Sequence, residues 1–377
     1  MNYPTRKLKD IALIRTGKLD SNAAVENGAY PFFTCDPQTL RIDKWAYDTE
    51  AVLLAGNNAS GNYTAKYYCG RFNAYQRTYI IETADSESLN TRFLCYAINQ
   101  KLSLLKTMSS GSTTKFLTIR MLHDIDIPCP TIEEQCKIIN RIGALDDLIE
   151  NNQKQIKLLE EAAQRLYKEW FIDLRFPGHE NTPIVDGVPD GWRKDTVGGI
   201  CSQKKLAVSA EVIPMGTPYI GLEHMPRKDF CLSLWGDAEK VTSNKFKYSE
   251  DDIIFGKIRP YFHKVGFAIN SGVVSTDSFV LRAEEGLWGL LLMTVFDKSF
   301  VDYTYKTCKE GAKMPRADWN QMETYEVMIP DNKTRIQFEK TIWNITRRIK
   351  TLAIQNRLFT EVRDRLLPKL IAGEIEV

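Results

Sequence analysis

Residues 138–170 read IINRIGALDDLIENNQKQIKLLEEAAQRLYKEW, and residues 338–370, which begin 200 positions later, read FEKTIWNITRRIKTLAIQNRLFTEVRDRLLPKL. In steps of four and three from Ile138, the first stretch places mostly apolar residues at positions 142, 145, 149, 152, 156, 159, 163, 166 and 170. The second stretch follows the same offsets from Phe338. Because a 4-3 apolar repeat is the seam of a coiled coil, the two stretches predict two long helices built to one plan.

The duplication extends to the segments that precede these helices. TEAVLLAG at 49–56 matches SEDDIIFG at 249–256, and TYII at 78–81 matches SFVL at 278–281, again 200 positions apart. GAYPFF at 28–33 resembles GTPYI at 216–220 with a different spacing. Between these anchors the two halves diverge. The sequence therefore predicts one unit made twice, each with an α+β globular part followed by a long helix.

Turn residues and helix caps set the expected boundaries. A chain of 377 residues suits two or three domains. Thr131 and Glu134 form a capping box for the first helix, and Asp331 is a candidate N-cap for the second. Pro368 is expected to kink or end the second helix early. The expected parts are a first domain at 1–131, a first spacer helix at 132–172, a linker at 173–190, a second domain at 191–331, and a second spacer helix with a tail at 332–377.

Composition excludes several classes of protein. With 50 basic and 48 acidic residues and a net charge of +2, the chain is not an indiscriminate polycation. Its eight cysteines form no CxxC pair and its four histidines do not cluster with them, so we expect reduced thiols and no metal site. We also expect no signal peptide, no membrane partner and a cytoplasmic location, since no apolar run approaches the ~18 residues that span a bilayer.

Catalytic signatures are missing from the sequence. It contains no GxxxxGK[ST], GxSxG or HExxH, no GxGxxG opening a helix, and no Pro-Pro-Tyr of the adenine-N6 methyltransferase type. Pro330-Asp331-Asn332-Lys333 faintly echoes a nuclease motif, but helix capping explains Asp331 better. We therefore expect a chain that catalyses nothing alone and binds no cofactor itself.

Two pairs of equivalent loops are candidates for binding. KIRPYFHK at 257–264 interleaves cations with aromatics, which suits phosphate contacts beside base contacts, while the matching loop of the first half carries amides and hydroxyls. GSTTK at 111–115 and GAKMPR at 311–316 form the second pair. The alternative is a solvated strand face with Ile258 and Phe262 buried, beside ordinary surface turns. The candidate DNA-binding residues are Asn57, Asn58, Ser60, Lys66, Ser112, Lys115, Lys257, Arg259, Tyr261, His263, Lys264, Lys313 and Arg316.

Asparagines at the helix seams predict how the helices pair. If the helices run antiparallel with facing residue numbers adding to 508, Asn152 faces Asn356, and Phe338 faces Trp170. Parallel packing would place each asparagine beside an apolar residue, so we expect the antiparallel register and a hydrogen bond between the two amides. The candidate spacer and partner-binding residues are Asn152, Leu159, Leu166, Trp170, Phe171, Ile349, Asn356, Phe359 and Leu366.

Taken in order, several motifs resemble the specificity subunits of type I restriction–modification systems. They are WFIDLRFPG at 170–178, PDGW at 189–192, YIGLEH at 219–224, IIFGKIRP at 253–260 and LLPKLIAGEI at 366–375. The first half departs from the pattern, with FFTC at 32–35 in place of the Tyr-Ile-Gly-Leu segment.

The resemblance implies two target recognition domains, each reading one half of a bipartite double-stranded DNA site. It implies two antiparallel helices that separate the domains and dock two methyltransferase subunits. S-adenosylmethionine, ATP and Mg would be bound by the methyltransferase and restriction/translocase partners. A competing hypothesis is a duplicated coiled-coil adaptor that binds proteins and has no salt-dependent affinity for DNA; an unrecognised nuclease or methyltransferase is a third.

Overall fold

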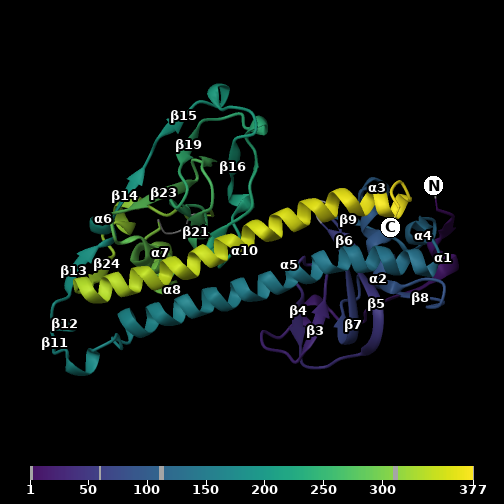
Figure 1. Cartoon of the computed structure of the whole chain (residues 1–377), viewed down its shortest axis with the longest axis horizontal. Coiled ribbons are helices and arrows are strands. Elements are labelled where there is room, and N and C mark those ends of the chain that lie inside the picture. The colour runs from purple at the N-terminus through teal and green to yellow at the C-terminus, as the bar shows by residue number, and fades with distance from the viewer. Residues whose placement is uncertain (1–2, 59–60, 110–113, 309–312, 377) are drawn as a thin grey trace. The chain divides into compact units, whose positions relative to one another are not determined.

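The chain folds into two compact units, of which the first is built from two separate stretches of sequence and the second from one continuous stretch. The computed structural model describes residues 3–58, 61–109, 114–308 and 313–376. The first unit comprises Met1–Leu148 and Phe359–Val377, and the second comprises Ile149–Leu358. Two long helices, α5 (Ile132–Tyr167) and α10 (Asn332–Ala372), each contribute residues to both units (Figure 1). A π-helical turn, η2 (Lys168–Ile172), continues α5.

The first unit is built on a six-stranded sheet against which α2 (Thr91–Gln100) packs. The strand order is β2-β8-β5-β7-β3-β4. Most neighbours are antiparallel, while β3 and β7 are parallel. The strands are β2 (Ala12–Thr16), β3 (Tyr30–Phe33), β4 (Leu40–Ile42), β5 (Tyr47–Ala55), β7 (Ala65–Ala74) and β8 (Thr78–Thr83). The short helices are α1 (Leu8–Ile11), α3 (Leu102–Met108) and α4 (Ile119–His123).

The second unit contains two five-stranded sheets. One has the order β14-β23-β20-β21-β17, and the other β15-β19-β22-β16-β18. The first sheet comprises β14 (Cys201–Lys204), β17 (Cys231–Leu232), β20 (Ile253–Gly256), β21 (Val265–Ala268) and β23 (Ser278–Ala283). The second comprises β15 (Ala207–Val208), β16 (Pro218–Ile220), β18 (Gly236–Asp237), β19 (Lys245–Tyr248) and β22 (Gly272–Val274). The short helices of the second unit are α6 (Val197–Ile200), α7 (Trp288–Phe296), α8 (Lys298–Lys306) and α9 (Trp319–Met322).

The internal repeat is confirmed element by element. The run β2-β8-β5-β7 in the first sheet corresponds to β14-β23-β20-β21, and β8 and β23 begin and end 200 positions apart. A two-stranded antiparallel pair also occurs in each half, β1 (Thr5–Lys7) with β10 (Asp126–Pro128) and β13 (Arg193–Thr196) with β24 (Glu326–Ile329). Between the halves, β11 (Ile184–Val185) and β12 (Val188–Pro189) form a small hairpin.

Both long helices begin at the caps that the sequence predicts. The Thr131 backbone N–H donates to Glu134 Oε2 at 2.9 Å, and the Glu134 N–H donates back to Thr131 Oγ1 at 3.4 Å. Asp331 Oδ1 accepts from the N–H groups of Lys333 at 2.9 Å and Thr334 at 3.1 Å. These side chains satisfy backbone donors that have no partner within the helix.

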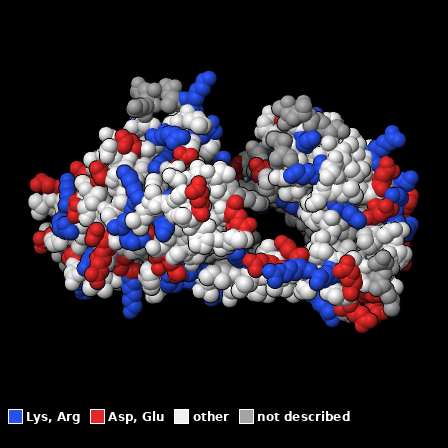
Figure 2. Space-filling view, turned by 90° about the horizontal axis from the view of Figure 1, so that it is seen from above, with Lys and Arg blue, Asp and Glu red and all other residues white. Residues whose placement is uncertain are grey.

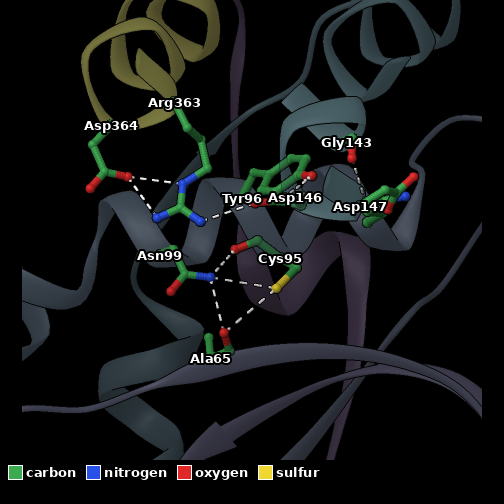
Figure 3. A network of polar contacts seen from close by, with 10 residues as sticks. Ala65, Cys95, Tyr96, Asn99, Gly143, Asp146, Asp147, Arg363 and Asp364 are labelled. Atoms are coloured by element: carbon green, nitrogen blue, oxygen red, sulfur yellow. Dashed lines mark hydrogen bonds and ion pairs between the residues drawn. The ribbon is translucent and has the colours of Figure 1, made fainter. Parts of the chain in front are cut away.

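Antiparallel pairing of the helices is confirmed within each unit. In the second unit, the rings of Trp170 and Phe338 lie 5.7 Å apart, as the register adding to 508 requires. In the first unit, Asp146 Oδ1 accepts from Arg363 Nη1 at 3.0 Å. The other oxygen of Asp146 accepts from the Tyr96 hydroxyl at 2.5 Å, so one carboxylate links both helices to α2 (Figure 3).

The predicted hydrogen bond between the two seam asparagines is wrong. Asn152 Nδ2 donates instead to Gln355 Oε1 at 3.4 Å. Asn356 Oδ1 is buried and has no hydrogen-bond partner among the described residues. The longer side chain of Gln355, one position away, satisfies Asn152 and leaves the neighbouring amide oxygen unpaired.

The last turns of α10 also depart from the expected seam. Leu366 is 38% exposed, whereas Leu367, Leu370 and Ile371 are buried. These three residues pack into the core of the first unit, and burial against a globular core requires a wider apolar stripe than a coiled-coil seam. Pro368 lies inside the helix and does not end it. Burying side chains of this size stabilises by about 1.5–3 kcal/mol each, enough to offset the roughly 3 kcal/mol cost of an interior proline.

Across the described ranges, no helix is both long and apolar enough to cross a membrane. In the same residues, no group of three or more His, Cys, Asp or Glu side chains is placed to hold a metal ion.

Candidate nucleic-acid interface

In each unit the fold brings together the two loops that the sequence singles out. In the first unit, β6 (Asn57–Asn58) pairs antiparallel with β9 (Lys115–Phe116). In the second unit, Ile258 forms an antiparallel bridge with Arg316. The flanking hydrogen bonds also correspond, since Leu117 N donates to Gly56 O and Ala317 N donates to Lys257 O, both at 2.8 Å. The repeated scaffold thus presents an equivalent surface twice, with different side chains on it.

A glycine leads into this surface in the first unit because the backbones approach closely. Gly56 follows β5, and its N–H donates to Arg77 O at 2.8 Å. A Cβ atom at this position would lie 2.4 Å from the same carbonyl oxygen. Any side chain here would therefore displace the strand end that positions Asn57 and Asn58.

Polar side chains of the first unit are partly engaged with their own fold. Asn58 Oδ1 accepts from Asn62 N at 3.2 Å, and Lys66 Nζ donates to Thr39 Oγ1 at 3.1 Å. Burial lowers the pKa of the Lys66 ammonium. Asn57 and Lys115 are half-buried on the β6–β9 pair. Ser60 and Ser112 lie outside the described residues.

Four of the candidate residues in the second unit have partners within it. Lys257 Nζ donates to Thr276 O at 2.6 Å, and Lys264 Nζ donates to Leu222 O. Burial lowers the pKa of both ammonium groups. Arg316 forms an ion pair with Asp277 at 2.8 Å. The ring of His263 is buried 4.6 Å from that of Phe296, and burial lowers the pKa of its imidazole.

Between these residues runs a tight turn with an unusual backbone. The 3-10 turn η7 (Pro260–Phe262) is flanked by Arg259 at φ 51°, ψ 67° and His263 at φ 54°, ψ 50°. Left-handed conformations of residues other than glycine cost on the order of 1–3 kcal/mol each and cluster at functional sites. At the tip of the turn, Tyr261 is exposed and its ring lies 5.2 Å from that of Tyr305. Lys313, on the neighbouring loop, is exposed.

The turn forms one wall of a cavity of about 240 Å³. Its lining residues are Leu222, Ile258, Arg259, Phe262, Lys264 and Met314. The guanidinium of Arg227 lies 4.0 Å from the centroid of the Phe262 ring. Leu222, Arg227 and Met314 were not among the residues predicted from the sequence. The YIGLEH motif at 219–224 was the available signal, because it contains Leu222.

Charge on the surface is mixed in sign. Figure 2 shows Lys and Arg side chains beside Asp and Glu side chains over the visible face. This agrees with the overall balance of 50 basic and 48 acidic residues. An interaction with nucleic acid would therefore depend on particular side chains rather than on bulk charge.

The long helices expose apolar residues other than the predicted spacer positions. In the second unit, Leu158 and Leu358 are 65% and 53% exposed, and in the first unit Leu148 and Val362 are each 45% exposed. Among the predicted positions, Trp170, Phe171 and Ile349 are buried, Leu159 and Leu166 are half-buried against the same core, and Phe359 is half-buried. Each unit thus exposes apolar side chains on its part of the long helices.

Comparison with known proteins gives consistent matches. Residues 2–161 match the family model described as the type I restriction modification DNA specificity domain. The EcoDI specificity subunit of a type I restriction enzyme from Escherichia coli is 28% identical, over 93% of this chain and 81% of its own. The MjaIX specificity subunit from Methanocaldococcus jannaschii is also 28% identical, over 76% of this chain and 69% of its own.

A solved structure shares the fold. The S subunit of a type I restriction–modification system from M. genitalium aligns with a TM-score of 0.63 over 98% of this chain and 96% of that chain, at 16% identity. The family model covers residues 2–161, which is less than half of the chain, and the relatives extend the match over most of it. Over most of its length the chain is therefore similar to the specificity subunits of type I restriction–modification systems.

Proposed function

We propose that this chain is the sequence-reading, non-catalytic subunit of a type I restriction–modification complex. Each globular domain reads one half of a bipartite DNA site, and the helices dock two methyltransferase subunits. One observation carries the proposal: the same loop pairing, β6 with β9 and Ile258 with Arg316, occurs in both halves with different side chains. Two equivalent scaffolds with different hydrogen-bonding groups are what two different half-sites require.

The partners supply the chemistry in this proposal. S-adenosylmethionine would be bound by the methyltransferase subunits, and ATP and Mg by the restriction/translocase subunits, all in the cytoplasm. The exposed Leu158 and Leu358 in one unit and Leu148 and Val362 in the other are apolar docking positions for the methyltransferases. A duplicated adaptor that binds only proteins is not favoured, because the relatives are named as restriction-enzyme specificity subunits.

The proposal is tested by methylation with purified components. We expect the chain alone to transfer no methyl group from labelled S-adenosylmethionine to DNA. With its methyltransferase partner, we expect methylated adenines at a single bipartite sequence in host DNA. Mapping methylated adenines in cells that express both subunits, with the methyltransferase alone as the control, gives the sequence. Methylation by the complex without any sequence preference would overturn the proposal.

A further inference from the structure

Arg259 differs from its basic neighbours in what its side chain contacts. Lys257 and Lys264 donate to backbone carbonyl oxygens, Arg316 forms an ion pair, and His263 is buried against a ring. The half-buried guanidinium of Arg259 has no hydrogen bond or ion pair among the described residues, and its Nε is buried without an acceptor. The guanidinium instead lies near an aromatic ring, with Arg259 Cζ 5.7 Å from the centroid of the Phe262 ring.

The backbone holds Arg259 in place firmly. Its N–H donates to Pro315 O and its carbonyl accepts from Phe262 N, both at 2.8 Å. It adopts a left-handed conformation although a proline follows, a position where the α region is disfavoured. These hydrogen bonds therefore fix an unfavourable conformation that aims one unpaired arginine along the wall of the cavity.

The walls around the guanidinium are mostly apolar. Leu222, Ile258, Phe262 and Met314 line the cavity with Arg259, and the remaining cation, Lys264, already donates to Leu222 O. A planar group with several N–H donors in such surroundings matches an edge that offers two acceptors side by side. In duplex DNA, guanine presents this edge in the major groove through O6 and N7.

We infer that Arg259 is a specificity-determining residue that reads a guanine in the half-site bound by the second domain. The inference rests on the proposed function. The guanidinium donates two hydrogen bonds, one to O6 and one to N7 of that guanine. Lys313, exposed on the adjoining loop, contacts phosphate and carries no base preference.

The experiment uses the chain in complex with its methyltransferase partner and a duplex carrying the mapped target site. Each guanine of the two half-sites is replaced in turn by 7-deazaguanine, which lacks the N7 acceptor, and binding is measured by fluorescence anisotropy. We expect one position in one half-site to weaken the unaltered complex about 5-fold or more. In the Arg259→Ala complex, the same replacement should have no further effect.

Matched variants separate base reading from charge. Replacing that guanine pair by another base pair should cost the unaltered complex about 5- to 150-fold, the equivalent of about 1–3 kcal/mol. Arg259→Lys should reduce this discrimination while keeping non-specific affinity, because lysine lacks the planar fork of donors. Lys313→Ala should weaken binding to all duplexes alike and reduce the salt slope by about one unit.

Three outcomes would overturn the inference. In the first, both Arg259 variants discriminate at every guanine as well as the unaltered complex does. A uniform loss like that of Lys313→Ala is another, because it would make Arg259 a phosphate contact. In both cases the unaltered complex still selects its site, so the proposed function stands. An unaltered complex that selects no sequence would overturn the inference and the proposed function together.

Discussion

Glu160 is a buried carboxyl that joins a long helix to the second globular domain. Its Oε1 accepts from the backbone N–H of Phe230 at 2.7 Å, and the residue is 6% exposed. Burial raises the pKa of this carboxyl from 4.5 to about 7, although the hydrogen bond from Phe230 opposes the shift. The folded second unit therefore binds a proton at Glu160 that the unfolded chain releases at lower pH.

This pKa shift sets the sign of a pH dependence. Between pH 4.5 and 7 the folded state binds more protons than the unfolded state, so the contribution of Glu160 to stability falls as pH rises through this window. The full change is at most about 3 kcal/mol. Glu160→Gln keeps an acceptor for Phe230 and cannot ionise. We expect the variant to gain stability relative to the unaltered chain at pH 8 but not at pH 4.5.

The measurement is the urea midpoint of the second unit, followed by hydrogen exchange of its strands at pH 5 and pH 8. Glu169→Gln is the matched control, because Glu169 is exposed in the turn that continues the same helix. Equal pH dependence in Glu160→Gln and in the unaltered chain would contradict the assignment.

At the residue scale, the sequence indicates where the candidate loops lie more reliably than which of their side chains are free of partners within the fold. The 200-position repeat located both loop pairs, because loop position follows from the scaffold. Whether a cationic side chain is free to bind a ligand depends on hydrogen-bond acceptors that lie far from it in the sequence. Thr276 and Leu222, which accept from Lys257 and Lys264, carry no signal that links them to these lysines in the sequence. His263 is likewise buried, although it lies between two half-buried residues in sequence.

At the scale of the elements, the helix seam contains one satisfied and one unsatisfied amide. Asn152 donates to Gln355, whereas Asn356 Oδ1 is buried without a partner in the described part of the chain. An unsatisfied buried acceptor costs about 1–3 kcal/mol. We expect Asn356→Leu to stabilise the second unit by about 1 kcal/mol and Asn152→Leu to destabilise it, because the latter leaves Gln355 without its donor.

Urea unfolding of the two variants, each compared with the unaltered chain, measures the difference. The result that would count against this account is a loss of stability in Asn356→Leu equal to that in Asn152→Leu. That the two helices pair was predictable from the apolar 4-3 period, and their direction and approximate register were predicted from the positions of the seam asparagines. The hydrogen-bond partners of the amides were not predictable, because the apolar period is the same whether Asn152 pairs with Asn356 or with the adjacent Gln355.

At the scale of the whole molecule, the end of α10 completes the core of the first unit. Leu367, Leu370 and Ile371 share a buried cluster with Leu8, Phe93 and Ile138. Truncating a buried leucine to alanine typically costs 2–5 kcal/mol. We expect Leu370→Ala to destabilise the first unit by about this amount and to leave the second unit unchanged, even though residues 332–358 of the same helix belong to the second unit.

Hydrogen exchange resolves the two units, with amides in β8 and α2 reporting on the first and those in β20 and β23 on the second. Leu366→Ala is the control on the same helix turn, since Leu366 is 38% exposed, and it should change exchange little in either unit. Faster exchange in β20 and β23 of Leu370→Ala, with β8 and α2 unaffected, would show that this division of the core is wrong.

The interrupted make-up of the first unit has a consequence during protein synthesis. A ribosome that has made Met1–Leu148 must still translate the 210 residues of Ile149–Leu358 before it reaches the segment that carries Leu370. At about 5–20 residues per second this takes roughly 10–40 s. For that time the nascent chain holds Ile138 and Ile142 without Leu367, Leu370 and Ile371, which share their buried cluster. The domain that emerges first is therefore completed last.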